Sequence, residues 1–365
     1  MPRPRPLLSF DFEPPARHDA STLDEEADEP PKKWFHYLPL CTLVFLMVAP
    51  HPSLLLVLLN HYLRTMHDHA GFFVHLLVTY ILTFLAFSSL IVCVARDPGP
   101  VSIDKPSLEA QNGGRDDLGL TEALMSMPDE DELSPVKWCR KCWAPKPERT
   151  HHCSICGRCV LKMDHHCPWL GSKCVGHRTY PAFFHFITCI TLLSSYIAII
   201  AGSAFWWSFN NTGLVLDQTT PIHELFLTAA GMIFGVVVGS FTVYHMYLIS
   251  TNQTTLESLS PFLLLRHLPP LPESLRLSDP PLEHELSYKQ RSLVRDAHRV
   301  VKIYNLGWRK NWAQVFGWSK PRGWLYRIMY GGATKGDGRL FPRNPQAEEM
   351  LSKLARRLAT ADKDA

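Results

Sequence analysis

The organisation of this chain is decided by residues 137–169, KWCRKCWAPKPERTHHCSICGRCVLKMDHHCPW, and by Cys174 shortly after them. Together they hold seven of the chain's ten cysteines, and the spacing C-x-x-C occurs three times. Two thiolates at that spacing can bind one metal ion from a single turn, and nearby histidines can complete a tetrahedral set. Because zinc prefers thiolate combined with imidazole, this stretch predicts zinc binding.

A count of the ligands separates structure from chemistry. Two closed sites of three cysteines and one histidine each would use six of the seven cysteines. Such closed sites are structural, because no coordination position is left for a reaction. Cys167 is the candidate for the spare thiol, since Asp164 and His165 before it could supply an orienting carboxylate and a base. The residues alone leave a second interpretation open, a double-zinc module in which the seventh cysteine is inert.

The cysteine-rich stretch resembles that of the Asp-His-His-Cys (DHHC) protein S-acyltransferases, also called palmitoyltransferases. Three outlying segments are also similar to this family, namely Asp97-Pro98-Gly99, Thr254-Thr255-Leu256-Glu257 and residues 304–317. The resemblance therefore covers roughly residues 36–320.

This resemblance implies a role for each site residue. It implies two interleaved ligand sets, each holding one structural zinc ion: Cys139, Cys142, His152 and Cys159, and Cys153, Cys156, His166 and Cys174. It also implies that Asp164 orients His165, that His165 acts as the base, and that Cys167 carries an acyl group.

The sequence departs from the family pattern just after Cys167. The spacing from Cys167 to Cys174 is one residue longer than is usual in the family, and Lys173 stands where asparagine is usual. The extra residue falls at Gly171-Ser172, where a loop can absorb it.

Four apolar stretches are each close to the ~20 residues that a helix needs to cross a bilayer. They are residues 36–60, 72–94, 182–207 and 225–249. We therefore expect an α-helical multi-pass membrane protein with four transmembrane helices and a small cytosolic double-zinc domain between helices 2 and 3. Pro50-His51-Pro52 should kink or break the first helix. Gly231, Gly235 and Gly239 predict either close helix packing or room for a lipid chain.

These features divide the chain into six parts. They are a disordered cytosolic tail (residues 1–33), helices 1 and 2 (34–95), a cytosolic linker (96–136), the zinc-binding domain (137–180), helices 3 and 4 (181–250) and a membrane-associated cytosolic C-terminal region (251–365). Within the last part, apolar spacing predicts helices over residues 288–304 and 346–359.

Basic residues indicate the orientation. Lysine and arginine are frequent in residues 96–181 and after residue 250, whereas the 61–71 loop has only Arg64 and the 208–222 loop has none. Positive residues favour the cytosolic side, so we expect both termini and the zinc-binding domain in the cytosol. A reducing cytosol also keeps thiols free for metal. We expect a membrane of the endoplasmic reticulum or Golgi.

The resemblance implies an enzyme that accepts an acyl group from palmitoyl-CoA on Cys167 and passes it to cysteines of cytosolic-side proteins. Its partners would be long-chain acyl-CoA, substrate proteins and the bilayer, and the net charge of +3 gives no reason to expect nucleic acid. The sequence does not single out the residues that contact CoA. Two rival hypotheses are an inactive membrane scaffold and a ubiquitin ligase with a ring-like zinc site, both of which need Cys167 to be dispensable or metal-bound.

Overall fold

The computed structural model describes residues 33–101, 138–142, 144–214, 217, 219–271, 278, 280–318 and 323–361. Most of the predicted tail at 1–33 and of the predicted linker at 96–136 lies outside these residues.

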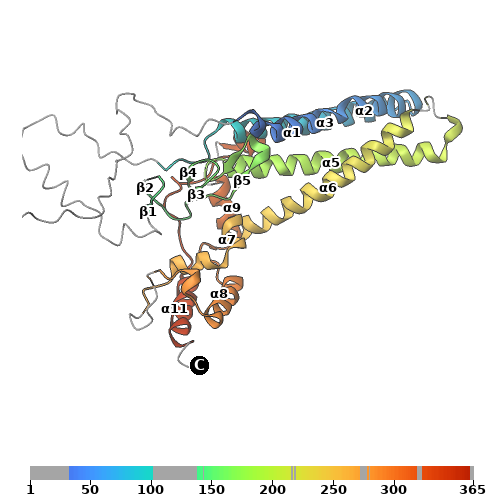
Figure 1. Ribbon diagram of the computed structural model, residues 1–365. Coiled ribbons are helices and arrows are strands. Elements are labelled where there is room, and N and C mark those ends of the chain that lie inside the picture. The colour runs from blue at the N-terminus through green and yellow to red at the C-terminus, as the bar shows by residue number, and fades with distance from the viewer. Residues whose placement is uncertain are drawn as a thin grey trace, which may run out of the picture.

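Long apolar helices run side by side and form the membrane part of the molecule (Figure 1). Its elements are η1 (Trp34–Tyr37), α1 (Leu38–Val48), α2 (Pro50–Val57), the π-helical η2 (Leu58–Thr65), α3 (His69–Ala95), α5 (Tyr180–Asn210), the short η5 (Thr212–Leu214) and α6 (Thr220–Thr251). Within the described residues, four helical segments are long and apolar enough to cross a bilayer: Trp34–Thr65, His69–Ala95, Tyr180–Asn210 and Thr220–Thr251. This arrangement confirms the predicted fold class.

The helices extend one to five residues beyond each end of the apolar stretches. A helix satisfies its own backbone groups, so helical structure continues after the side chains become polar. At the prolines of the first segment, α1 ends at Val48 and α2 begins at Pro50. Ala49 between them keeps helical angles, with φ −56° and ψ −32°, so the element is interrupted without leaving helical geometry.

Close packing joins α5 and α6. A Cβ atom on Gly231 would lie 2.7 Å from the carbonyl oxygen of Ser194, which real side chains do not tolerate. Gly235 and Gly239 also face α5, at Ser195 and Thr191. The glycines of α6 therefore serve helix packing, the first of the two interpretations of their spacing.

Three small antiparallel hairpins build the cysteine-rich unit between α3 and α5. They are β1 (Trp138–Cys139) with β2 (Ala144–Pro145), β3 (His151–Cys153) with β4 (Arg158–Val160), and β5 (His165–Cys167) with β6 (Lys173–Val175). The turn η4 (Pro168–Leu170) follows β5. A buried apolar cluster connects Cys167 and Val175 of this unit to Phe183 of α5 and to Phe316 in the C-terminal region.

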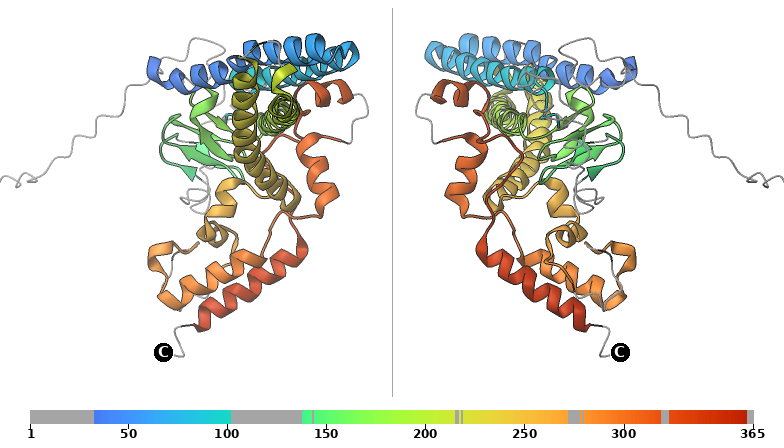
Figure 2. Two further views of the ribbon diagram at one scale, coloured as in Figure 1. Left: turned by 90° about the vertical axis from the view of Figure 1, so that its right-hand side faces the viewer. Right: turned by 90° about the vertical axis from the view of Figure 1, so that its left-hand side faces the viewer.

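The C-terminal region consists of short helices and turns. They are α7 (Thr255–Leu259), η6 (Pro261–His267), η8 (Glu283–Glu285), α8 (Tyr288–Val300), α9 (Trp308–Phe316), α10 (Trp324–Tyr330) and α11 (Pro345–Thr360). Helices α8 and α11 pack together through a separate apolar core (Figure 2). The helix predicted over 288–304 ends at Val300, because the chain turns there so that Val301 and Tyr304 become buried while Val300 stays exposed.

Candidate active site

The first ligand set lies where the β1 and β3 hairpins meet. The ligand atoms of Cys139, Cys142, His152 and Cys159 all lie within 4.8 Å of one another. Nδ1 of His152 is 3.6 Å from Sγ of Cys139, 3.1 Å from Sγ of Cys142 and 4.0 Å from Sγ of Cys159. Tetrahedral zinc with bonds of about 2.0–2.3 Å needs ligand atoms roughly 3.5–3.8 Å apart, so this set could hold a zinc ion.

The second set is formed by the β3 and β5 hairpins. Its ligand atoms, from Cys153, Cys156, His166 and Cys174, also lie within 4.8 Å of one another. Nδ1 of His166 is 3.4 Å from Sγ of Cys156 and 3.8 Å from Sγ of Cys174. The donor chemistry again fits zinc.

The one-residue insertion is absorbed between β5 and β6. Gly171 and Ser172 both adopt left-handed backbone angles, with φ 69° and 53°. His166 stays directly opposite Cys174 in the hairpin register. The Nε2 atom of His166 lies 3.0 Å from the Ser172 hydroxyl, which therefore fixes the ring with Nδ1 towards the sulfurs.

Strand alternation explains why the two sets interleave. Successive side chains of a strand point to opposite faces, so His152 and Cys153 of β3 go to different sets. On β5, His166 faces the second set, while His165 and Cys167 share the other face. Cys167 belongs to neither ligand set among the described residues, and it is buried in the apolar cluster. The fold thus separates one sulfur from the metal ligands.

His165 is held between a carboxylate and that sulfur. Its Nδ1 lies 2.8 Å from Oδ2 of Asp164, and Cys167 is close enough to favour the protonated form of the ring. Burial lowers the pKa of His165, but the hydrogen bond to Asp164 and the interaction with Cys167 outweigh burial and raise the pKa to about 9. An imidazole in this position readily accepts the proton of the thiol. Asp164, His165 and Cys167 are therefore brought together as the sequence predicted.

Asp164 is buried, and its two oxygens are held by Thr255 of α7. The backbone N–H of Thr255 donates to Oδ1 at 2.9 Å, and its hydroxyl donates to Oδ2 at 2.7 Å. Burial raises the pKa of Asp164, but several interactions lower it, and the hydrogen bond from His165 is the largest of these. Because the net effect lowers the pKa, the carboxylate stays ionised. Sequence reasoning matched the Thr254–Glu257 motif but gave Thr255 no role.

A buried arginine fixes the helix that carries Thr255. Thr254 and Glu257 form a capping box at the start of α7. Arg149 donates to both oxygens of Glu257 at 2.7 Å and to Asn252 at 3.0 Å, and it lies over the ring of Tyr304 at 4.2 Å. Sequence reasoning missed this network. The T-x-x-E capping pattern was the one local signal that could have indicated part of it.

The segment Asp97-Pro98-Gly99 ties the end of α3 to the cysteine-rich unit. Asp97 pairs with Arg158 of β4 at 2.6 Å and accepts the backbone N–H of Gly99 at 2.8 Å. The carbonyl oxygens of Gly99 and Pro98 accept the backbone N–H groups of Leu161 and Arg178. The site is consequently held against the membrane helices at both of its ends.

Comparison with known proteins agrees with this geometry. The family model of the DHHC palmitoyltransferases matches residues 132–261. The chain is 34% identical over 196 residues to "Probable protein S-acyltransferase 7" of Arabidopsis thaliana, covering 50% of this chain and 43% of that protein. It is 33% identical over 222 residues to "Palmitoyltransferase ZDHHC15" of Homo sapiens, covering 60% of this chain and 54% of that protein.

A third relative is "Palmitoyltransferase PFA3" of Gibberella zeae, at 31% identity over 257 residues, covering 55% of this chain and 45% of that protein. The chain spans about half the length of these curated relatives. The match lies on the segment that contains both ligand sets, Cys167 and the Thr254–Glu257 motif. Residues 132–261 therefore contain a DHHC palmitoyltransferase domain, and the curated relatives that match this chain are named as palmitoyltransferases or protein S-acyltransferases.

Proposed function

We propose that this protein is a protein S-acyltransferase that takes an acyl group from palmitoyl-CoA onto Cys167 and transfers it to cysteines of substrate proteins. One observation carries the proposal. Cys167 lies outside both ligand sets, on the same face of β5 as a histidine that is bonded to a buried carboxylate. The two ligand sets would hold structural zinc ions, which fix the hairpins but leave no open position for substrate.

In the first half-reaction, His165 takes the proton from the Cys167 thiol while Asp164 stabilises the imidazolium that forms. The thiolate attacks the thioester carbonyl of palmitoyl-CoA. The bond from the carbonyl carbon to the CoA sulfur breaks, and CoA leaves as a thiol after receiving the proton from His165. The product is a thioester on Cys167.

In the second half-reaction, His165 takes the proton from a cysteine thiol of the substrate protein. That thiolate attacks the acyl group, and Cys167 leaves and recovers a proton. One thioester replaces another in each half-reaction, so no further energy source is required.

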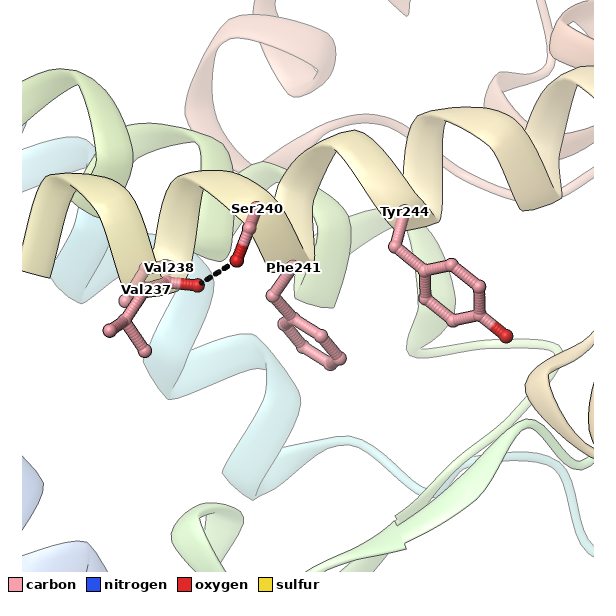
Figure 3. Close-up of a pocket in the computed structure, with 5 residues that line it drawn as sticks. All are labelled: Val237, Val238, Ser240, Phe241 and Tyr244. Atoms are coloured by element: carbon pink, nitrogen blue, oxygen red, sulfur yellow. Dashed lines mark hydrogen bonds between the residues drawn. The ribbon is translucent and has the colours of Figure 1, made fainter.

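A groove on α6 suits the acyl chain. It has a volume of about 500 Å³ and is lined by Val237, Val238, Ser240, Phe241 and Tyr244. Figure 3 shows these side chains on one side of the helix. The ring of Phe241 contacts Phe183, which in turn contacts His165, with ring centroids 6.0 and 5.1 Å apart. An apolar chain in this groove would end close to the reacting groups.

The proposal includes cytosolic substrates. Both termini and the cysteine-rich unit would face the cytosol, because basic residues are frequent beside them and sparse in the two opposite loops. Residence in the endoplasmic reticulum or Golgi is also proposed, on the resemblance alone.

The test is the mass of the acyl adduct. Purified protein in lipid nanodiscs is incubated with palmitoyl-CoA and digested, and the peptide containing Cys167 is weighed before and after hydroxylamine. We expect one hydroxylamine-labile palmitoyl group on Cys167, absent in Cys167→Ser and retained in Cys41→Ser, which removes an exposed cysteine elsewhere. Acylation that persists in Cys167→Ser would falsify the assignment of the nucleophile. A wild-type protein that binds zinc but gains no acyl group on Cys167 would favour the inactive membrane scaffold instead.

A further inference from the structure

His245 lies next to the reacting groups, although neither the proposed catalytic set nor the ligand sets include it. It belongs to α6 and is fully buried. Its ring centroid is 6.2 Å from that of His165, 5.2 Å from that of Phe183 and 4.5 Å from that of Phe241. His245 therefore lies between the histidine that faces Cys167 and the aromatic end of the α6 groove.

The hydrogen bonding of His245 is incomplete. Its Nδ1 lies 3.0 Å from the hydroxyl of Tyr180, which is itself buried. Its Nε2 is buried and has no hydrogen-bond partner among the described residues. A buried polar atom without a partner is uncommon in a folded protein and calls for an explanation.

The hydrogen-bond partner of Nδ1 determines which ring nitrogen of His245 carries the proton. Among the described residues, His245 is the hydrogen-bond partner of the Tyr180 hydroxyl, and a buried hydroxyl donates its proton where an acceptor is present. If Tyr180 donates to Nδ1, the neutral ring must carry its proton on Nε2. The structure then contains a fixed, unpaired N–H donor at the junction of groove and reaction centre.

We propose that the Nε2–H group of His245 binds the carbonyl oxygen of the acyl thioester. This inference rests on the proposed function. When the Cys167 thiolate adds to the thioester, the carbonyl oxygen becomes negatively charged, and His245 donates a hydrogen bond to it. When the intermediate collapses and CoA leaves, the oxygen becomes a carbonyl again. His245 keeps its proton throughout and acts as an electrostatic donor rather than as an acid or a base.

The surroundings of His245 support this role. Phe183 and Phe241 exclude water from the ring, and a donor in a water-poor site stabilises developing charge more than one in water. Tyr180 holds the ring from the other side, so the donor is fixed before substrate arrives. A histidine serving only as packing would leave Nε2 unpaired without any gain.

The test uses single-turnover acylation of Cys167 by palmitoyl-CoA in nanodiscs. His245→Phe preserves an aromatic ring and removes the donor, so we expect acylation to slow by about 100- to 1,000-fold. His245→Gln restores an N–H close to the Nε2 position, so its acylation should be at least about tenfold faster than that of His245→Phe. Tyr180→Phe should slow acylation by roughly three- to tenfold, because Nδ1 loses its donor. Tyr247→Phe, at an exposed tyrosine of the same helix, should match the wild type.

A second measurement separates this role from a structural one. Alkylation of Cys167 by iodoacetamide develops no charge on a carbonyl oxygen, so its rate should be unchanged in His245→Phe, as should the zinc content. An equal loss of alkylation and acylation would overturn the inference, as would a His245→Phe variant that acylates at the wild-type rate or a His245→Gln variant as slow as His245→Phe. If wild-type protein is not acylated at all, the proposed function itself fails.

Discussion

Thr255→Val removes one hydrogen-bond donor from the carboxylate behind the proposed base while preserving the shape of the side chain. In the native protein, the Thr255 hydroxyl donates to Oδ2 of Asp164 at 2.7 Å, and the same oxygen accepts from His165 at 2.8 Å. The backbone N–H of Thr255 still donates to Oδ1 in the variant. Asp164 then has one donor from Thr255 in place of two, so its orientation towards His165 is held less firmly.

The magnitude follows from the charge of the acceptor. A hydrogen bond to a charged group contributes about 1.5–3 kcal/mol. Each 1.36 kcal/mol of transition-state stabilisation corresponds to about a tenfold change in rate. If most of this bond is needed to keep Asp164 aligned with His165 in the transition state, Thr255→Val should slow the acylation of Cys167 by about 10- to 100-fold.

The assay is the rate of acyl-enzyme formation with saturating palmitoyl-CoA, followed by rapid quenching and intact mass. Thr255→Ser is the matched control, because it keeps the hydroxyl and loses only the methyl group. It should stay within about threefold of the wild type. Zinc content and thermal midpoint report whether either variant is misfolded. The reasoning is refuted if Thr255→Val acylates as fast as the wild type, or if Thr255→Ser is equally slow.

Three further predictions concern the support of the site. Arg149→Met leaves the Glu257 carboxylate without its arginine partner and should destabilise the fold by about 3 kcal/mol. An unchanged thermal midpoint would contradict this prediction. The double variant Arg149→Met with Glu257→Gln should recover part of the lost stability. Cys174→Ser should leave one tightly bound zinc ion and little acylation, measured by metal analysis beside the acylation rate; full activity with one zinc would exclude a supporting role for the second set. Burial lowers the pKa of His177 from 6.5 to about 4. As the pH falls, His177 therefore takes up a proton in the unfolded chain before it does so in the folded protein. The stability that the neutral His177 contributes is fully present above the unfolded pKa of 6.5 and is lost as the pH drops towards 4. Between about pH 8 and about pH 5 the loss should be about 2 kcal/mol, and His177→Gln but not the exposed His284→Gln should reduce this acid sensitivity in thermal unfolding.

Much of the architecture could be predicted because its signals are local. The apolar stretches predicted the four membrane segments, and the observed helices are only a few residues longer at each end. The C-x-x-C spacing predicted metal binding directly, whereas the assignment of ligands to two interleaved sets came with the resemblance. In the structure, the alternation of β3 and β5 accounts for that interleaving, since it turns neighbouring residues to opposite faces.

The contacts that complete the site could not be predicted, because they join residues far apart in the chain. Thr255 meets Asp164 across 91 positions, and Arg149 meets Glu257 across 108 positions. His245 lies in an apolar helix where sequence periodicity marks it only as one polar residue among many apolar ones. Its relation to Tyr180 and His165 depends on how α5 and α6 pack against the cysteine-rich unit.

The central idea is that a single sulfur does chemistry while its neighbours only hold metal. Native mass spectrometry of the protein after brief exposure to palmitoyl-CoA tests it on individual molecules. The account predicts a species that carries two zinc ions and one palmitoyl group together, and a Cys167→Ser variant that keeps both zinc ions and gains no palmitoyl. Acylated molecules that have lost a zinc ion, or a Cys167→Ser variant with only one, would contradict it.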